Sequence, residues 1–190
     1  MIFRSDLLDG QRVAVAGGDG TAATLTELRR LGAWAEAMPD GVALAADQAS
    51  GWVTARAPLH GLVFDAADSF GSGGPSGLRD AMRLAWLATR AVATGALISA
   101  GAEHGPGGGR LLLVAPRPRA GVHAGAAGAA LENLARTLSV EWARFSVTAV
   151  AICPGQRTSD EQLAQLVCFL LSPAGGYYSG CRWALGAATR

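Results

Sequence analysis

Short apolar runs recur along the chain and alternate with stretches of helical periodicity. Continuous apolar runs, rather than a strict alternation of apolar and polar residues, are typical of strands buried on both faces of a parallel sheet. We predict such strands at residues 11–17, 33–38, 60–67, 110–115 and 146–152, and a short last strand at residues 182–185. Residues 42–46 fit one more strand, and so little sequence separates it from residues 33–38 that no crossover helix is expected between the two.

Four longer segments have apolar residues at helical spacing. They are residues 21–31, 78–97, 123–145 and 160–171. The segment 78–97 carries two opposed apolar faces, so we expect one face to cover the sheet and the other to meet a partner. Strands that alternate with helices in this way predict an α/β fold, with a doubly wound parallel sheet in a single domain over residues 1–190.

The composition indicates that the protein forms an oligomer, and it argues against several kinds of partner. Hydrophobic residues make up 50% of the 190 residues and charged residues only 16%, which is more apolar surface than one small core needs. The net charge is +1 and the arginines are scattered, so no basic patch for nucleic acid or for an anionic membrane is expected. The first residues lack the basic segment and long apolar run of a signal peptide, which predicts a cytoplasmic protein.

The cysteines predict neither a disulfide framework nor a metal site. Cys153, Cys168 and Cys181 are odd in number, and no two of them have the C-x-x-C spacing of a zinc site. We expect them to be reduced and mostly packed in the core, and we expect no metal in this chain.

Several local sequences together resemble the short-chain dehydrogenase/reductase family. The clearest are Ala129–Trp142 and Val147–Gly155, which are similar to the family's helix after the active site and to its strand ending in Pro-Gly. Further matches are Leu8–Val15 and the tail from Phe169 to Gly180. The resemblance implies a Rossmann-like doubly wound sheet over nearly the whole chain. The family's mobile lid follows this Pro-Gly, whereas here Gly155 leads almost directly into the next helix, which implies a truncated fold without a substrate lid.

The same resemblance implies that the reaction centre is missing. In the family a Tyr-x-x-x-Lys pair handles the alcohol proton and binds the nicotinamide ribose, and these two positions fall on Ala124 and Gly128. The family's serine falls within residues 115–117, which read Ala-Pro-Arg, and its catalytic asparagine falls near Ala81. The chain contains no lysine at all, because every one of its 16 basic residues is arginine. We therefore expect no catalytic residues and a degenerate member of the family.

A glycine turn follows the first strand and is the candidate cofactor site. Residues 18–23 read Gly-Asp-Gly-Thr-Ala-Ala and formally fit G-x-G-x-x-A, with Asp40 about twenty residues on. Compared with the family's loop the turn is about two residues shorter, and Asp19 is placed to cap the next helix and to repel phosphate. We interpret Gly17, Gly18 and Gly20 as a vestigial site, with no cofactor in this chain and NAD(P) in the expected partner.

The family's dimers pair through two long helices, which correspond to residues 78–97 and 123–145 and keep their full length here. We therefore interpret the chain as a non-catalytic subunit that pairs with an active paralogue, or with itself, in a heterodimeric or heterotetrameric dehydrogenase. Its role would be to stabilise that enzyme or to complete its substrate pocket. The expected interface residues are Met82, Trp86, Arg90, Leu131, Leu138 and Trp142.

Two alternatives remain open from the sequence. One is an atypical NAD(P)-dependent oxidoreductase acting on an alcohol or ketone, which would bind its cofactor through Gly18 and Gly20. It would use His123, one residue from the tyrosine position, for proton transfer. The other is a ligand-sensing or regulatory homodimer.

Overall fold

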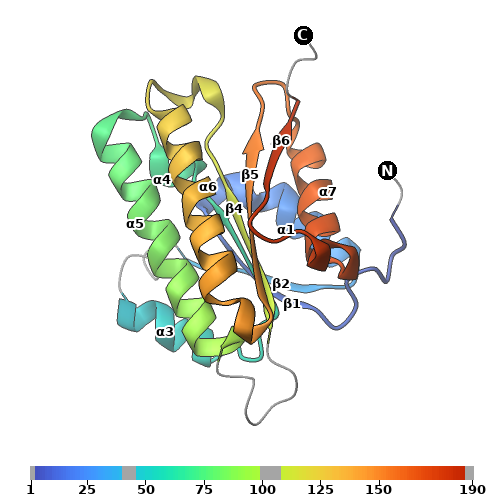
Figure 1. The fold of residues 1–190 in the computed structure, drawn as a ribbon. Coiled ribbons are helices and arrows are strands. Elements are labelled where there is room, and N and C mark those ends of the chain that lie inside the picture. The colour runs from blue at the N-terminus through green and yellow to red at the C-terminus, as the bar shows by residue number, and fades with distance from the viewer. Residues whose placement is uncertain (1–2, 40–45, 99–107, 187–190) are drawn as a thin grey trace.

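The computed structural model of the chain describes residues 3–39, 46–98 and 108–186, with the side chains of Asp19 and Ala46 excepted. Within this part, one six-stranded sheet forms the centre of the molecule, and every strand pair in it is parallel (Figure 1). The strand order across the sheet is β2-β1-β3-β4-β5-β6. The strands are β1 (Arg12–Ala16), β2 (Trp34–Ala37), β3 (Gly61–Asp65), β4 (Gly109–Val114), β5 (Val147–Pro154) and β6 (Arg182–Leu185).

Helices cover both faces of the sheet, and each face has its own hydrophobic core. One core lies between the sheet and three helices, α3 (Ala46–Thr54), α5 (Gly74–Val92) and α6 (Ala124–Glu141). The other lies between the sheet and α1 (Ala22–Arg30) and α7 (Asp160–Leu171). Figure 1 shows α5 and α6 side by side on one face, and α1 and α7 on the other. The predicted doubly wound α/β fold is therefore confirmed.

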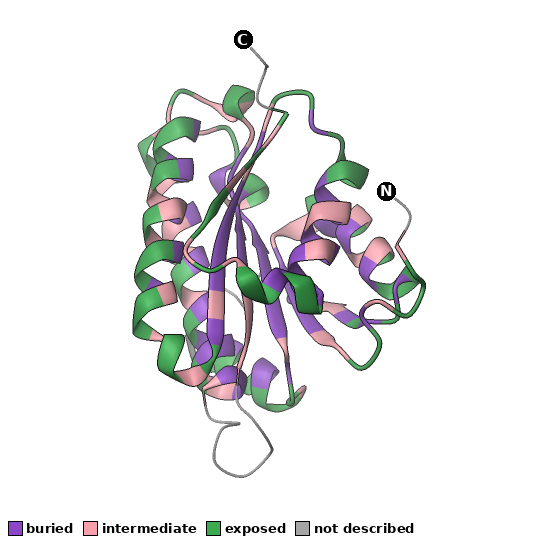
Figure 2. Ribbon diagram, turned by 45° about the vertical axis from the view of Figure 1, so that its right-hand side comes forward, coloured by how far each residue is buried: buried purple, intermediate pink, exposed green. Residues whose placement is uncertain are grey.

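The central strands follow the apolar runs because they are covered on both sides. All five residues of β3 are buried, and so are the last four of β4. Figure 2 shows the resulting buried interior between the two helical layers. A strand in this position has no water-facing side, so its sequence shows no polar alternation.

The boundaries of α7 agree with the predicted segment 160–171 because its first residues form a capping box. Ser159 accepts a hydrogen bond from the backbone N–H of Gln162 at 3.2 Å, and the Gln162 side chain accepts one from the backbone N–H of Ser159 at 3.0 Å. Asp160 and Glu161 in the first turn add negative charge at the positive end of the helix dipole.

The connection between β2 and β3 differs from the sequence prediction. No crossover helix was expected there, but α3 is present and packs against α5. The prediction was wrong because the buried side of α3 consists of only Ala49, Trp52 and Val53, with Gly51 between them, which gives a weak periodic signal. Of the strand predicted at 42–46, Ala46 begins α3, and residues 42–45 lie outside the described part of the chain, as does Asp40.

Part of the predicted interface on the two long helices faces the sheet and not the outside of the molecule. On α6, Leu131 and Leu138 are 0% and 2% exposed and belong to the core against the sheet. These two residues therefore cannot contact a partner in this conformation, which corrects the expected interface. On α5, Trp86 is 43% exposed and Arg90 is also exposed, whereas Met82 is half-buried, as is Trp142 just beyond α6.

Among the described residues, none of the helices combines the length and the apolar character needed to cross a membrane.

Candidate functional site

The strand order places one topological switch point in the sheet, between β1 and β3. From β1 the chain continues to β2 on one side, and the later strands follow on the other side. In doubly wound sheets, ligands bind beyond the carboxyl ends of the strands at such a point. Here those ends are the glycine turn after β1 and residues 65–68 after β3, so the structure places the sequence-predicted turn in the expected position.

The glycine turn packs tightly against the segment that follows β3. Gly17 and Gly18 have φ values of +135° and +70°, which favour glycine. A Cβ at Gly17 would collide with the carbonyl of Asp65, and a Cβ at Gly18 would collide with the carboxylate of Asp68. Residues 18–21 form a 3-10 turn, in which the Thr21 hydroxyl donates to the Gly18 carbonyl at 2.8 Å. The turn therefore has carboxylates beside it; the Asp19 side chain lies outside the described part.

Asp65 is the buried acid of this region. It is 8% exposed, and its carboxylate accepts one hydrogen bond, from the backbone N–H of Ala67 at 2.9 Å. Burial raises the pKa of Asp65 to about 6, opposed by the Ala67 hydrogen bond and assisted by the neighbouring charge of Asp68. Near neutral pH the carboxyl ends of β1 and β3 thus present negative charge, whereas a dinucleotide pyrophosphate needs free N–H donors and positive potential. These residues do not fit a pyrophosphate.

The positions that the family resemblance assigns to tyrosine, lysine and serine converge on one cavity. It has a volume of about 340 Å³ and lies beyond β4 and β5, where Ala124, Gly128, Ala115 and Pro116 all line it. A Cβ added to Gly128 would lie 3.6 Å from the Cβ of Ala115 and 3.8 Å from the sulfur of Cys153. Ala81 is fully buried in α5 and is not part of the lining. The cavity has the position of a reaction centre, but these four positions offer no side-chain proton donor or acceptor.

Three functional side chains at this cavity were not found by sequence reasoning. Cys153, Arg182 and Glu132 all line it. Nε of Arg182 donates to the sulfur of Cys153 at 3.3 Å and lies 3.4 Å from Oε2 of Glu132. These residues are far apart in the sequence, and only the pairing of β5 with β6 brings two of them together. The spacing along the chain gave no signal for this cluster.

His123 precedes α6 at its N-cap position and is half-buried. Its side chain makes no capping hydrogen bond, and within the described residues no carboxylate pairs with its ring. The alternative proton donor of the sequence analysis is therefore not oriented by a second group.

A short anchored loop follows β5, at the place where members of the short-chain dehydrogenase/reductase family have their lid. The side chain of Thr158 accepts from the backbone N–H of Gly155 at 2.9 Å and donates to the carbonyl of Leu185 at 3.3 Å. Arg117 donates to the carbonyl of Thr158 at 3.2 Å and to the carboxylate of Asp160 at 2.6 Å. These contacts tie the loop after β5 to β6 and to the segment after β4, so within the described residues this loop does not form a movable cover over the cavity.

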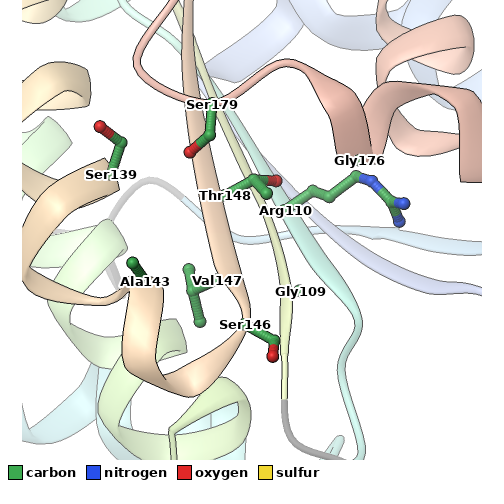
Figure 3. Close-up of a pocket in the computed structure, with 9 residues that line it drawn as sticks. All are labelled: Gly109, Arg110, Ser139, Ala143, Ser146, Val147, Thr148, Gly176 and Ser179. Carbon is green, nitrogen blue, oxygen red and sulfur yellow. The ribbon is translucent and has the colours of Figure 1, made fainter.

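A second cavity, of about 410 Å³, lies at the opposite ends of β4 and β5 (Figure 3). Arg110 and Thr148 are paired in register, and the Arg110 side chain extends toward Gly176. Ser139 on α6 lies on the other side of β5 in this view. The polar groups therefore do not converge on one point, and we assign no chemistry to this cavity.

No group of three or more metal-binding side chains occurs among the described residues. The three cysteines are free, but they differ in environment. Cys168 is buried, Cys153 is half-buried and Cys181 is exposed, so only one of them is packed in the core as expected.

The fold is similar to several solved structures. A citronellol catabolism dehydrogenase from Pseudomonas aeruginosa matches with a TM-score of 0.78 and 23% identity, over 100% of this chain and 99% of that chain. A variant of a Serratia marcescens short-chain dehydrogenase/reductase matches with a TM-score of 0.73 and 21% identity, over 94% and 96% of the two chains. The chain has the short-chain dehydrogenase/reductase fold. BdcA from E. coli is also similar, with a TM-score of 0.72 and 19% identity, over 94% and 100% of the chains.

No protein-family model matches the sequence, and no curated protein matches it either. The short-chain dehydrogenase/reductase fold is reached here with six strands and 190 residues.

The buried acid gives the protein a pH-dependent stability. Between the ordinary pKa of 3.8 and the folded-state pKa of about 6, the folded chain binds more protons at Asp65 than the unfolded chain does. The contribution of Asp65 to the free energy of unfolding therefore falls as pH rises through this window, by about 3 kcal/mol in total. We expect Asp65→Asn to remove this slope and to stabilise the protein at pH 8, measured by urea unfolding at a series of pH values.

The matched control is Asp80→Asn, which neutralises an exposed carboxylate on α5 and should keep the wild-type slope. Identical pH profiles for Asp65→Asn and the wild type would contradict the assignment.

Proposed function

We propose that this chain is a degenerate, non-catalytic member of the short-chain dehydrogenase/reductase family. It pairs in the cytoplasm with a catalytically active paralogue in a heteromeric NAD(P)-dependent dehydrogenase. Its role is to stabilise the active subunit or to complete that subunit's substrate pocket. The observation that carries this proposal is the cavity of about 340 Å³, where the tyrosine, lysine and serine positions are occupied by Ala124, Gly128 and residues 115–117.

Proton transfer to or from an alcohol needs a side chain that can hold a proton within hydrogen-bond reach of the substrate. At the three positions, alanine, glycine and proline have no such group. The arginine of residues 115–117 is already hydrogen bonded to Thr158 and Asp160. Within the described residues, no lid segment follows β5 that could exclude water from a reacting carbonyl. The positions that the family resemblance assigns to tyrosine, lysine and serine therefore supply no proton relay in the described part of the chain.

The nicotinamide cofactor is proposed to reside in the partner. The turn at Gly17 and Gly18 is packed against Asp65 and Asp68, and the Asp68 carboxylate lies directly beside Gly18. The negative charges of a phosphate and of the Asp68 carboxylate would repel each other in this partly dehydrated site.

The outer surface of α5 supports the pairing. Met82, Trp86 and Arg90 follow one another at four-residue intervals, so they lie on one side of the helix. An exposed tryptophan between an exposed arginine and a methionine is typical of the residues that dominate binding energy at protein interfaces. Val140, which is 78% exposed, adds an apolar residue on α6, and Trp142 follows the end of that helix. Leu131 and Leu138 are left out of the proposed interface because they belong to the core.

The pairing is tested by purifying the tagged chain together with a co-expressed short-chain dehydrogenase that has an intact Tyr-x-x-x-Lys. We expect Trp86→Glu to reduce the recovered partner at least about tenfold, because it removes the apolar surface of the indole and places a charge at the centre of the interface. The matched control is Trp34→Glu, the same change at a residue of similar exposure, 39%, on edge strand β2. Equal recovery with both variants would argue against an α5 interface.

The cofactor assignment is tested by titrating the isolated chain with NADH and NADPH and following protein and nicotinamide fluorescence. We expect no saturable binding below about 1 mM. Asp68→Asn removes the carboxylate next to Gly18 and should bind at least as well as the wild type. Saturable micromolar binding to the wild-type chain would place the cofactor here instead of in the partner.

A further inference from the structure

The cavity that lacks the proton relay contains a thiol with an unusual set of neighbours. Cys153 stands near the end of β5 and is half-buried, with its sulfur 3.8 Å from the position of a Cβ on Gly128. On the other side the sulfur accepts a hydrogen bond from Nε of Arg182 at 3.3 Å. A guanidinium N–H directed at the sulfur places a positive charge beside the nucleophilic atom of the cysteine.

The charges around this thiol form a chain of three groups. Arg182 lies between the sulfur and Glu132, whose second carboxylate oxygen is held by Arg136 at 2.7 Å. The hydrogen bond to Cys153 raises the pKa of Arg182, so the guanidinium stays charged. Within the described part of the chain the Nη groups of Arg182 have no hydrogen-bond partner, which leaves N–H donors for an oxygen of a ligand.

The other two cysteines of the chain lack these features. The Cys181 thiol is exposed and donates to the carbonyl of Ser179 at 3.7 Å, and it does not line the cavity. Cys168 is buried in the core between the sheet and α7, and burial raises its pKa to about 12. Of the three, only Cys153 combines access to a cavity with a cationic hydrogen-bond donor.

The walls of the cavity restrict which electrophile can reach the sulfur. They are formed mostly by alanine, glycine, proline, valine and leucine, and the charged groups among them are Glu132 and Arg182. A volume of about 340 Å³ lined in this way suits a small, largely apolar molecule with one polar oxygen, and it does not suit a highly charged peptide such as a glutathione disulfide.

We infer that Cys153 is a covalent binding site for small α,β-unsaturated ketones or aldehydes, with Arg182 as the group that donates a hydrogen bond to the sulfur and holds the carbonyl oxygen. The thiolate sulfur forms a bond to the β-carbon, and the electron pair of the carbon–carbon double bond moves to the carbonyl oxygen, giving an enolate beside Arg182. The α-carbon then takes a proton from water. The hydroxide that remains is neutralised by the proton that the thiol released to solvent. The net step is addition of a thiol across a double bond, and it needs no oxidant or reductant.

This inference does not depend on the proposed pairing, because the thiol, the guanidinium and the cavity all belong to this chain. It gives the cavity a ligand-binding role that needs neither a proton relay nor a nicotinamide cofactor.

The test uses the full chain and 2-cyclohexen-1-one, with each cysteine followed by peptide mass spectrometry over time at pH 7. We expect Cys153 to be alkylated about tenfold faster than Cys181, and Cys168 to remain unmodified in the folded protein. Cys153→Ser should remove the fast adduct. Alkylation of Cys181 at the same rate as Cys153, or faster, would overturn the inference.

Two charge variants give opposite expectations, which loss of folding could not produce. Arg182→Gln should slow Cys153 about tenfold, toward the rate of free N-acetylcysteine in the same buffer. Glu132→Gln should accelerate Cys153, because it removes the negative charge that offsets Arg182 beside the attacking sulfur. Rates that are unchanged in both variants, or lowered in both, would contradict the role of Arg182.

Binding in the cavity is separated from simple reactivity by a variant that fills it. Gly125 lines the cavity, and a Cβ added there meets no atom within 4 Å, so Gly125→Leu is compatible with the fold. We expect this variant to slow cyclohexenone much more than the smaller acrylamide, and to abolish saturation of the rate with cyclohexenone concentration. Equal effects on the two reagents would show that the cavity does not bind the electrophile.

Discussion

The close approach of α6 to the carboxyl ends of β4 and β5 is the constraint on which the rest of the structure depends. The helix turns Ala124, Ala127 and Gly128 toward the sheet in its first turns, and Leu131 one turn later. Small side chains permit this approach, and the leucine then fills the wider space over the sheet. The same small residues occupy the positions where an active enzyme of this fold would need a phenol and an ammonium group. The close packing of α6 thus depends on the same small residues that leave these two positions without a phenol or an ammonium group.

The carboxylates at the ends of β1 and β3 also argue against a dehydrogenase reaction in this chain. The glycine turn after β1 is closed against Asp65 and Asp68, so the region with the geometry of a phosphate site carries negative charge. The loop after β5 is short and tied down through Thr158 and Arg117. What the fold retains is a rigid sheet, two long helices with an exposed tryptophan on one of them, and an open cavity. This combination favours a scaffold and binding role over a hydride-transfer enzyme.

Much of the fold could be predicted because buried parallel strands and capped helices leave direct signals in the sequence. β3 and β4 are uninterrupted apolar runs, and the capping box at Ser159 marks the start of α7. The helix α3 was missed because only three of its residues, on either side of Gly51, are buried. The sides of α6 were partly misassigned because helical spacing groups Leu131 with Leu138 but does not say whether that side meets the sheet or a partner.

The candidate site could also be predicted only in part. The resemblance located Ala124, Gly128 and residues 115–117, and the structure brings them to one cavity. The cluster of Cys153, Arg182 and Glu132 could not be predicted, because it depends on the register in which Arg182 pairs with Ala151, two residues before Cys153 on β5. Strand register is a tertiary property, and no local spacing encodes it.

We propose that this chain has no proton relay for an alcohol or a ketone. The most direct measurement is the change in NAD(P)H absorbance when the purified chain alone is given a panel of alcohols and ketones with either cofactor. The account predicts no rate above that of the buffer. Turnover by the chain alone that disappears in His123→Ala would contradict it.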